Sequence, residues 1–436
     1  MNPSYSDVAN RSIDSGGDKL VRLFVDPPTL DQHISTDATS AQVIVEIHGG
    51  LVTINKKLEL ALDLTESWDI SDDGMAYTFQ IREDAVFHGG RPVTADDVLW
   101  SFERPTLYGT GPSKLKRYDV GETLLLARND DYYLGLPKLA EVEMILSGGT
   151  AMLMYENNEI HITRVGLADL DRLLDTNNAL NAELRRASRQ FSIQYIGLNV
   201  NEPPLDGPKV RQALNLAIDK QEIATIVLGD QVVPATGILR PGFPRHDPDL
   251  KDYAFDPKRA QQLLAESKYG EDPENVPPII MTSSGSFGAE VDLDVVMSMW
   301  KNNLGLQVVF QRTKFTIFLR NLHKNRHQMF RAGWIVDYPD PENFFDMLFF
   351  SESSNNHTNY DSPEVDAILM EARTESNEVD RYELYNQAEK HILEEAPWVP
   401  LWYSGERYVL VKPNVRDYYQ TPLVIPRLRY VYLGDG

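Results

Sequence analysis

The sequence contains no cysteine. This absence excludes disulfide bonds, thiolate metal sites, a cysteine nucleophile and a lipid anchor on an N-terminal cysteine. It fits an oxidising compartment. The chain also lacks any uninterrupted apolar run near the roughly 20 residues that span a bilayer, and residues 1–20 lack the charged and apolar regions of a signal peptide. We therefore expect no membrane span and no signal peptide in these residues.

Basic residues are scarce relative to acidic ones. The chain has 42 Lys and Arg against 65 Asp and Glu, a formal net charge of −23 at pH 7. This excess of negative charge disfavours binding to nucleic acid or to an anionic membrane surface. Contents of 42% hydrophobic and 25% charged residues are typical of a globular protein, and 436 residues predict two or three domains.

The stretch at residues 328–345, QMFRAGWIVDYPDPENFF, combines a short apolar run with an acidic, aromatic loop. The run predicts a strand that ends near Asp337, because Pro339 and Pro341 fix the backbone and prevent a helix there. A carboxylate anchored by a sheet but facing open space is suited to capture a cationic group. Trp334 offers a flat apolar wall beside it.

Three further motifs lie between residues 68 and 101. They read W-x-x-S-x-D-G-x-x-Y-T-F-x-I-R at 68–82, F-H-G-G-R-P at 87–92 and T-A-D-D-V-x-W-S at 94–101. With G-W-x-x-D-Y-x-D-P-x-x-F at 333–344, the sequence resembles the extracellular solute-binding proteins of ABC transporters, family 5, the oligopeptide and dipeptide family. The motifs at 68–101 are scaffold, so they indicate the family without showing a site.

The resemblance implies an α/β fold of the periplasmic-binding-protein type II kind, with two lobes joined by a hinge. A long segment that relatives carry after the S-F-E-R helix is missing near residue 104, so the accessory domain is expected to be reduced. The implied division is a disordered tail at 1–20, a large lobe at 21–41, 109–255 and 407–436, an accessory domain at 42–108 and a second lobe at 256–406.

The resemblance also implies the binding residues. The aspartate at Asp337 pairs with the α-amino group of a bound peptide in that family, Trp334 lines the same pocket and Tyr338 follows in the motif. Arg331 matches an arginine that binds the ligand carboxylate in some relatives, and a structural ion pair is the alternative. The loop at Thr36, Asp37 and Ala38 is expected to contribute from the large lobe.

The function implied is that of the periplasmic or extracellular substrate-binding component of an ABC transporter. It captures short peptides by hinge closure, delivers them to a membrane permease and acts as a monomer without catalysis, cofactor or metal. Metal chelates, haem and oligosaccharides are alternative ligands in the same family. A hydrolase that uses an acid pair in the 337–342 loop is the alternative from another class, although nothing in the sequence marks one acid for a raised pKa.

Local patterns predict the other elements. Thr94 is expected to cap a helix, Pro208 to begin one, and residues 75–81 to form a half-buried strand. Strands at 279–282 and 306–312 alternate with helices at 290–303 and 315–324, and Trp398 and Trp402 are expected in the core. His323 and His327 indicate a solvated basic face rather than a metal site. Residues 109–114 predict a turn rather than a phosphate-binding loop.

Overall fold

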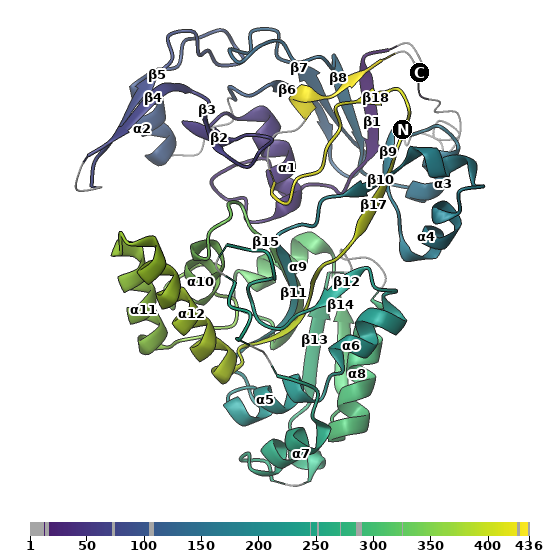
Figure 1. Cartoon of the computed structure of the whole chain (residues 1–436), viewed down its shortest axis with the longest axis vertical. Helices are drawn as coiled ribbons and strands as arrows, with labels where there is room; N and C mark the ends of the chain where they lie inside the picture. The colour runs from purple at the N-terminus through teal and green to yellow at the C-terminus, as the bar shows by residue number, and fades with distance from the viewer. Residues whose placement is uncertain are drawn as a thin grey trace. The chain divides into compact units, whose positions relative to one another are not determined.

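The computed structural model describes residues 13, 17–71, 75–103, 109–244, 246–250, 253–270, 272–284, 290–324, 326–424 and 428–434. The chain folds into two compact units (Figure 1). The first contains Met1–Ser188 and Arg407–Gly436, and the second contains Arg189–Glu406. Most of the predicted tail at 1–20 lies outside the described residues, but a strand already begins at Lys19.

A seven-stranded sheet organises the first unit. Its strands, in sheet order, are β10 (Leu184–Ala187), β17 (Arg407–Val411), β9 (Ile162–Arg164), β1 (Lys19–Leu23), β8 (Glu141–Ile145), β7 (Thr123–Arg128) and β6 (Ser113–Asp119). β1 runs parallel to β8 and β9, its neighbours on either side. Parallel neighbours cannot be joined by a tight turn, and here the chain between β1 and β8 includes α1 and α2, while α3 lies between β8 and β9.

Two helices of the first unit begin at side-chain caps. The Asp37 side chain accepts hydrogen bonds from the amides of Thr39 and Ser40 at the start of α1 (Ala38–Ile47). The amide of Asp97 donates to Thr94 Oγ1 at 3.4 Å at the start of α2 (Ala95–Glu103), which confirms the predicted cap. The other helices are α3 (Ala151–Glu156), α4 (Leu167–Leu174), and the short 3₁₀ helices η1 (Ala179–Glu183) and η4 (Leu428–Tyr430).

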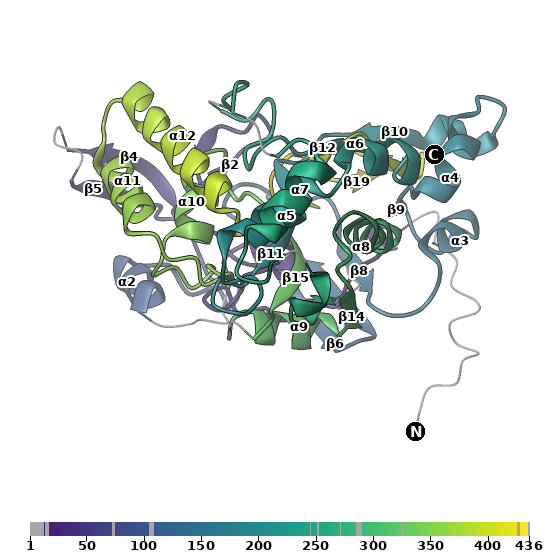
Figure 2. The same cartoon turned by 90° about the horizontal axis from the view of Figure 1, so that it is seen from below.

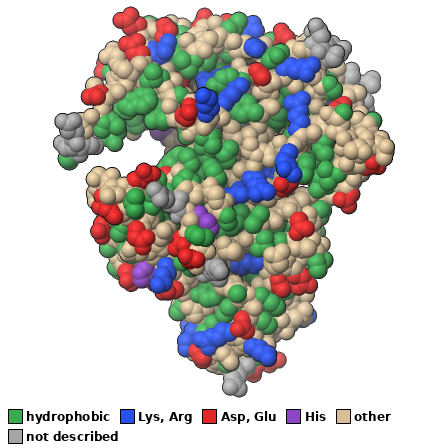
Figure 3. Space-filling view, in the orientation of Figure 1, with side chains coloured by type: hydrophobic (Ala, Val, Ile, Leu, Met, Phe, Trp, Pro, Cys, Tyr) green, Lys and Arg blue, Asp and Glu red, His purple; other side chains and the backbone are tan. Residues whose placement is uncertain are grey.

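Three two-stranded sheets complete the first unit. They pair β2 (Val52–Ile54) with β3 (Leu60–Leu62), β4 (Thr65–Ile70) with β5 (Tyr77–Ile81), and β18 (Val415–Arg416) with β19 (Tyr432–Leu433). The predicted half-buried strand at 75–81 is wrong in part: Met75 lies outside β5 and is 84% exposed, and Tyr77 is 60% exposed. This face of β5 is not covered, because β5 pairs only with β4 among the described strands. Apolar side chains are visible on the surface in this region of Figure 3.

A six-stranded mixed sheet organises the second unit. Its strands, in sheet order, are β12 (Val232–Pro234), β16 (Trp398–Ser404), β11 (Ser192–Leu198), β15 (Met329–Ile335), β13 (Ile279–Ser283) and β14 (Val308–Arg312). β11 is antiparallel to both of its neighbours, β15 and β16, whereas β13 is parallel to β14 and β15. Trp398 and Trp402 of β16 are 4% and 3% exposed, as predicted for core residues.

Two groups of helices belong to the second unit. α10 (Glu342–Phe349), α11 (Pro363–Thr374) and α12 (Glu378–Glu395) lie together (Figures 1 and 2), and the end of α12 meets α5 (Pro208–Leu216), where Arg211 donates to the Glu395 carbonyl. The second group consists of α5, α7 (Pro257–Ala265) and α8 (Val291–Leu304). The short elements are α6 (Lys220–Glu222), the π-helix η2 (Ile223–Val227), η3 (Pro273–Asn275) and α9 (Phe315–Leu322). Trp300 of α8 is fully buried, and its indole donates to the Leu214 carbonyl of α5 at 2.9 Å. The predicted alternation of strands and helices between 279 and 324 is confirmed.

The structure divides the chain differently from the prediction. Residues 189–255 supply β11 and β12, whose hydrogen-bonded neighbours β15 and β16 lie in the predicted second lobe. A strand belongs to the core of the sheet in which it pairs, so this segment is part of the second unit. The predicted boundary between residues 41 and 42 falls within α1 and would split one helix. A separate accessory domain at 42–108 stays a prediction.

The chain passes between the units twice, after Ser188 and after Glu406. On the first-unit side, β10 and β17 pair antiparallel, with Ala187 opposite Arg407. On the second-unit side, Arg189 forms an ion pair of 3.2 Å with Glu406. The two crossing segments are therefore neighbours, which is the arrangement expected of paired hinge strands.

A buried histidine lies beside β1. His161 is 0% exposed, and its Nδ1 accepts a hydrogen bond from the Val21 amide at 3.0 Å. A protonated Nδ1 cannot accept this bond, so the folded chain requires the neutral ring. Burial lowers the pKa of His161 to about 4.

Acidification therefore destabilises the first unit through His161. The unfolded imidazole takes up a proton below its ordinary pKa of 6.5, whereas the folded one stays neutral down to about 4. Stability falls as the pH falls between these values, by about 2 kcal/mol at about pH 5. We expect His161→Asn, which keeps an acceptor near Val21, to lack this part of the loss when unfolding by denaturant is measured from about pH 7.5 to 5. The partly exposed His391→Asn is the control. Equal acid sensitivity of His161→Asn and the unaltered chain would show that another group is responsible.

Candidate functional site

The site begins where β15 leaves the sheet. β15 pairs with β11 along its whole length, from Met329 opposite Leu198 to Ile335 opposite Ser192. The Val336 amide makes one more bond, to the Phe191 carbonyl at 3.0 Å. The chain then turns through residues 337–341 into α10, so the predicted strand followed by a proline-bound loop is present. Asp337 is the first residue beyond the paired strand.

The Asp337 side chain is exposed to solvent, although protein atoms surround it closely enough to desolvate the carboxylate in part. This desolvation raises the pKa of Asp337, and a hydrogen bond with the Asn343 side chain opposes the rise. Within the described part of the chain, no Lys, Arg or His side chain forms an ion pair with it. The carboxylate is thus anchored at its backbone and available to a cation from outside.

Asn343 ties Trp334 to the acidic loop, and sequence reasoning missed it. This residue is 1% exposed, in the first turn of α10. Its Oδ1 accepts from Trp334 Nε1 at 3.0 Å and from the Asp337 amide at 3.2 Å. Trp334 itself is half-buried. The available signal was weak, because an asparagine near the start of a helix ordinarily indicates a cap.

The remaining acids of the loop are engaged by the protein itself. Tyr338 donates its hydroxyl to Glu342 at 2.6 Å, and burial together with this bond raises the pKa of Tyr338. Both oxygens of Asp340 accept from Arg381 of α12, each at 2.8 Å. The raised pKa of Asp337 is a feature that the sequence did not predict. Asp340 and Glu342, the acids that could form a hydrolase acid pair in this loop, already have partners within the protein. The structure therefore does not support the hydrolase alternative.

Arg331 occupies the position of a structural ion pair. Arg331 and Asp292 are 3.2 Å apart with side chains 5% and 7% exposed. Burial lowers the pKa of Arg331 and raises that of Asp292, and their mutual attraction opposes both shifts. Successive side chains of a strand alternate between its faces, so Arg331 and Trp334 project from opposite faces of β15. The structure thus favours the alternative of a structural pair over a role in binding the ligand carboxylate.

The predicted loop at Thr36, Asp37 and Ala38 lies in the first unit. Asp37 caps α1, with its carboxylate 3.0 Å and 2.8 Å from the amides of Thr39 and Ser40. Ala38 is the first residue of that helix. A ligand-binding role for these three residues stays a prediction.

The predicted solvated basic face is wrong for His327, which is buried, whereas His323, Lys324 and Arg326 are exposed. α9 ends at Leu322, so the two histidines do not share a helix face. His327 is 7% exposed and stacks on Phe318 at a centroid distance of 5.1 Å, while His323 contacts the ring of His357 at 5.1 Å. No group of three or more His, Cys, Asp or Glu in the described residues is arranged to hold a metal ion.

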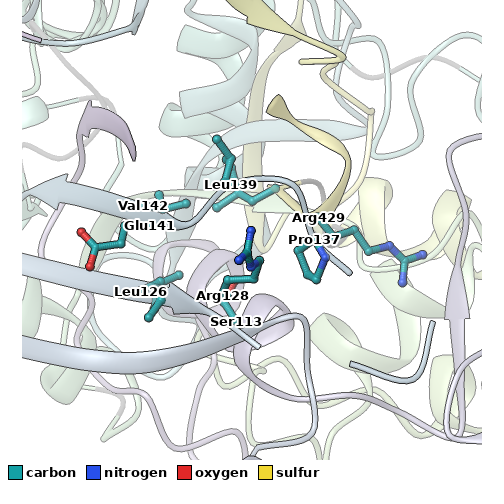
Figure 4. Close-up of a pocket in the computed structure, with 10 residues that line it drawn as sticks. Ser113, Leu126, Arg128, Pro137, Leu139, Glu141, Val142 and Arg429 are labelled. Carbon is teal, nitrogen blue, oxygen red and sulfur yellow. The ribbon is translucent and has the colours of Figure 1, made fainter. Parts of the chain in front are cut away.

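Two pockets lie away from the acidic loop. One, in the first unit, lies between Leu139, Val142 and Arg429 and has a volume of about 10 Å³ (Figure 4). Such a volume holds at most about one water molecule. The other, of about 520 Å³ in the second unit, is polar, and its Ser351 hydroxyl donates to Asp361 at 3.3 Å. Neither is lined by Trp334, Asp337 or Tyr338.

A model of bacterial extracellular solute-binding proteins, family 5, middle region, matches residues 59–107 and 105–356. The two matched segments meet at 105–107, where the sequence predicts a missing segment, and residues 104–108 lie outside the described structure. Among the described residues, no helix has both the length and the apolar character needed to cross a membrane.

Individual proteins are similar over most of the chain. The dipeptide-binding protein DppE of Bacillus subtilis is 24% identical over 473 residues, covering 87% of this chain and 86% of that protein. Heme-binding protein A of Haemophilus influenzae is 24% identical over 505 residues, covering 92% and 88%. The structure of a dipeptide-binding protein from a Pseudoalteromonas species in complex with Met-Leu matches with a TM-score of 0.86 at 21% identity, covering 95% of this chain and 100% of that one. The predicted periplasmic-binding-protein fold is confirmed.

The pair between Asp340 and Arg381 holds the loop against α12, with side chains 26% and 22% exposed. We expect Arg381→Met to lower the free energy of unfolding of the second unit by about 1–3 kcal/mol, because Asp340 loses both bonds while partly buried. Denaturant titration measures the change. Lys268→Met, which removes an exposed pair with Asp206, is the control and should cause no measurable change. Equal stability of both variants would mean that the Asp340 pair does not fix the loop.

Proposed function

The chain belongs to the bacterial extracellular solute-binding proteins, family 5, and on this basis we propose that it captures short peptides as the substrate-binding component of an ABC transporter. It works in the periplasm or outside the cell, as a monomer, and delivers the ligand to the permease of the transporter in the membrane. No step of this function is catalytic.

One observation carries the peptide assignment. Asp337 presents an exposed carboxylate directly after a central strand, with no ion pair to a described basic side chain. The α-amino group of a peptide is a compact cation that such a carboxylate binds through a charge-assisted hydrogen bond. The indole of Trp334, held by Asn343, forms an apolar wall beside this position. The pair thus recognises the amino end of a ligand and leaves its side chains unspecified.

The ligand is retained by hinge closure. The crossings after Ser188 and Glu406 are flanked by paired strands, so bending is concentrated in a few residues on each segment. Backbone groups of edge strands hydrogen-bond the peptide main chain, which gives affinity that does not depend on sequence. Dipeptide-binding relatives support this choice of ligand.

Haem is the second candidate, because heme-binding protein A of Haemophilus influenzae is also similar over most of its length. Haem carries two carboxylates and no ammonium group, so it offers no cation to Asp337. Native mass spectrometry of freshly purified protein, together with its visible absorption spectrum, distinguishes the two. A co-purified peptide supports the proposal, and a Soret band with no peptide contradicts it.

Replacement of Asp337 tests the recognition of the amine. We expect Asp337→Asn to weaken binding of peptides with a free amine at least about thirtyfold, because breaking a charge pair costs about 2–5 kcal/mol. Asp249→Asn, at an exposed loop acid of the same unit, is the matched control and should bind normally. Isothermal titration with free and N-acetylated alanine peptides of about two to five residues gives the affinities. Equal binding of free and acetylated peptides by the unaltered chain would show that Asp337 does not read the amine.

A further inference from the structure

One buried carboxamide joins the two residues proposed to recognise the ligand. Asn343 is 1% exposed, and its Oδ1 accepts from Trp334 Nε1 at 3.0 Å and from the Asp337 amide at 3.2 Å. Indole and backbone N–H groups only donate, so the oxygen of the amide must face them. Both acceptor positions of the amide oxygen are thereby used.

The Nδ2 group of Asn343 acts on the Asp337 carboxylate. Hydrogen bonding by the Asn343 side chain acts to lower the pKa of Asp337, and the larger effect of burial raises it. Since Oδ1 is occupied, the donor is the Nδ2 group. Donation to a carboxylate favours its ionised form. A single side chain therefore holds the indole and the loop backbone through Oδ1, and it favours the charged form of the Asp337 carboxylate.

We propose that Asn343 is the positioning residue of the binding site, fixing the Trp334 indole and the Asp337 carboxylate in the arrangement that receives a ligand amine. The inference rests on the proposed function, because it concerns the same site. Asn343 itself is buried and acts through the two residues that it holds. It also sets the lower end of the pH range in which the carboxylate stays charged and binds cations.

Other charges near Asp337 do not take over this role. They include Asp340 of the loop, Glu342 and Asp346 of α10, Arg381 of α12, Arg331 of β15 and Asp292 of α8. The shift in the pKa of Asp337 comes from burial and from Asn343, without a contribution from these groups. Changing Asn343 is therefore expected to change the titration of Asp337 directly.

Asn356 is a matched control in the same unit. It is 5% exposed, and its Oδ1 accepts from the Thr358 hydroxyl and the Tyr360 amide, each at 3.2 Å. Its Nδ2 donates to the carbonyls of Phe350 and Tyr360. Replacing Asn356 by aspartate keeps both acceptor bonds and removes both donor bonds, without touching Trp334 or Asp337. The same change at Asn343 also keeps two acceptor bonds but removes the donor to Asp337.

The test is the pH dependence of affinity for alanine peptides with a free amine, measured by calorimetric titration from about pH 4.5 to 8. Affinity falls as Asp337 takes up a proton. Asn343→Leu removes the donor and raises the pKa of Asp337, so we expect the midpoint of this fall to move up by about half a pH unit or more. At neutral pH we expect a loss of about tenfold, as for one lost hydrogen bond to a charged group.

Asn343→Asp is the second variant, because it keeps the acceptor for Trp334 and for the Asp337 amide and so preserves the loop. It replaces the donor with a second carboxylate, which again raises the midpoint. Asn356→Asp should keep the midpoint of the unaltered chain. A uniform loss of affinity at every pH in both Asn343 variants, with an unchanged midpoint, would mark a merely structural role and overturn the proposal.

The same peptides distinguish a failure of amine recognition by Asp337 from a failure of the positioning role of Asn343. If the unaltered chain binds none of them, or binds free and acetylated forms equally, amine recognition fails and the role of Asn343 fails with it. If the unaltered chain prefers the free amine, but affinity falls at the same pH in the Asn343 variants as in the unaltered chain, only the role of Asn343 fails. A preference for the free amine with raised midpoints in both variants supports both levels.

Discussion

The register between β11 and β15 is the constraint on which the site depends. The two strands pair without interruption over Ser192–Leu198 and Met329–Ile335. A slip of one residue would exchange the faces of Arg331 and Trp334, because side chains alternate along a strand. The buried pair of Arg331 with Asp292 opposes such a slip, since it would leave a carboxylate buried without its partner. Arg331 thus serves the site from the far face of its own strand.

Local signals in the sequence were sufficient for most individual elements. The Thr94 cap and the proline at the start of α5 act within one helical turn, so the sequence alone specifies them. Pairing between distant segments was not accessible in the same way. β11 was assigned to the other lobe because β15, its partner, lies more than a hundred residues later. The alternation at Tyr77 predicted a covered face, yet covering depends on a neighbour that the pattern does not encode.

The site was predictable to the extent that a motif carried it. Asp337 and Trp334 followed from the resemblance, whereas Asn343 did not, because its role depends on where a loop folds back. The sequence alone could have predicted that Arg331 and Trp334 lie on opposite faces of the strand, because they are three residues apart. The spacing of His323 and His327 failed for a simpler reason: α9 ends at Leu322, so helical periodicity no longer applies to them. Spacing rules hold only inside the element that justifies them.

The order of segments along the chain has a consequence for biosynthesis. β17 separates β10 from β9 in the seven-stranded sheet, so β10 has no strand beside it until residues 407–411 have left the ribosome. The second unit, a continuous segment, is complete once Glu406 has emerged. Since domains generally fold as units during translation, the second unit finishes while the first still waits for its last strand. In that interval the nascent chain exposes the open edge of β9, at which a foreign strand can pair in place of β17.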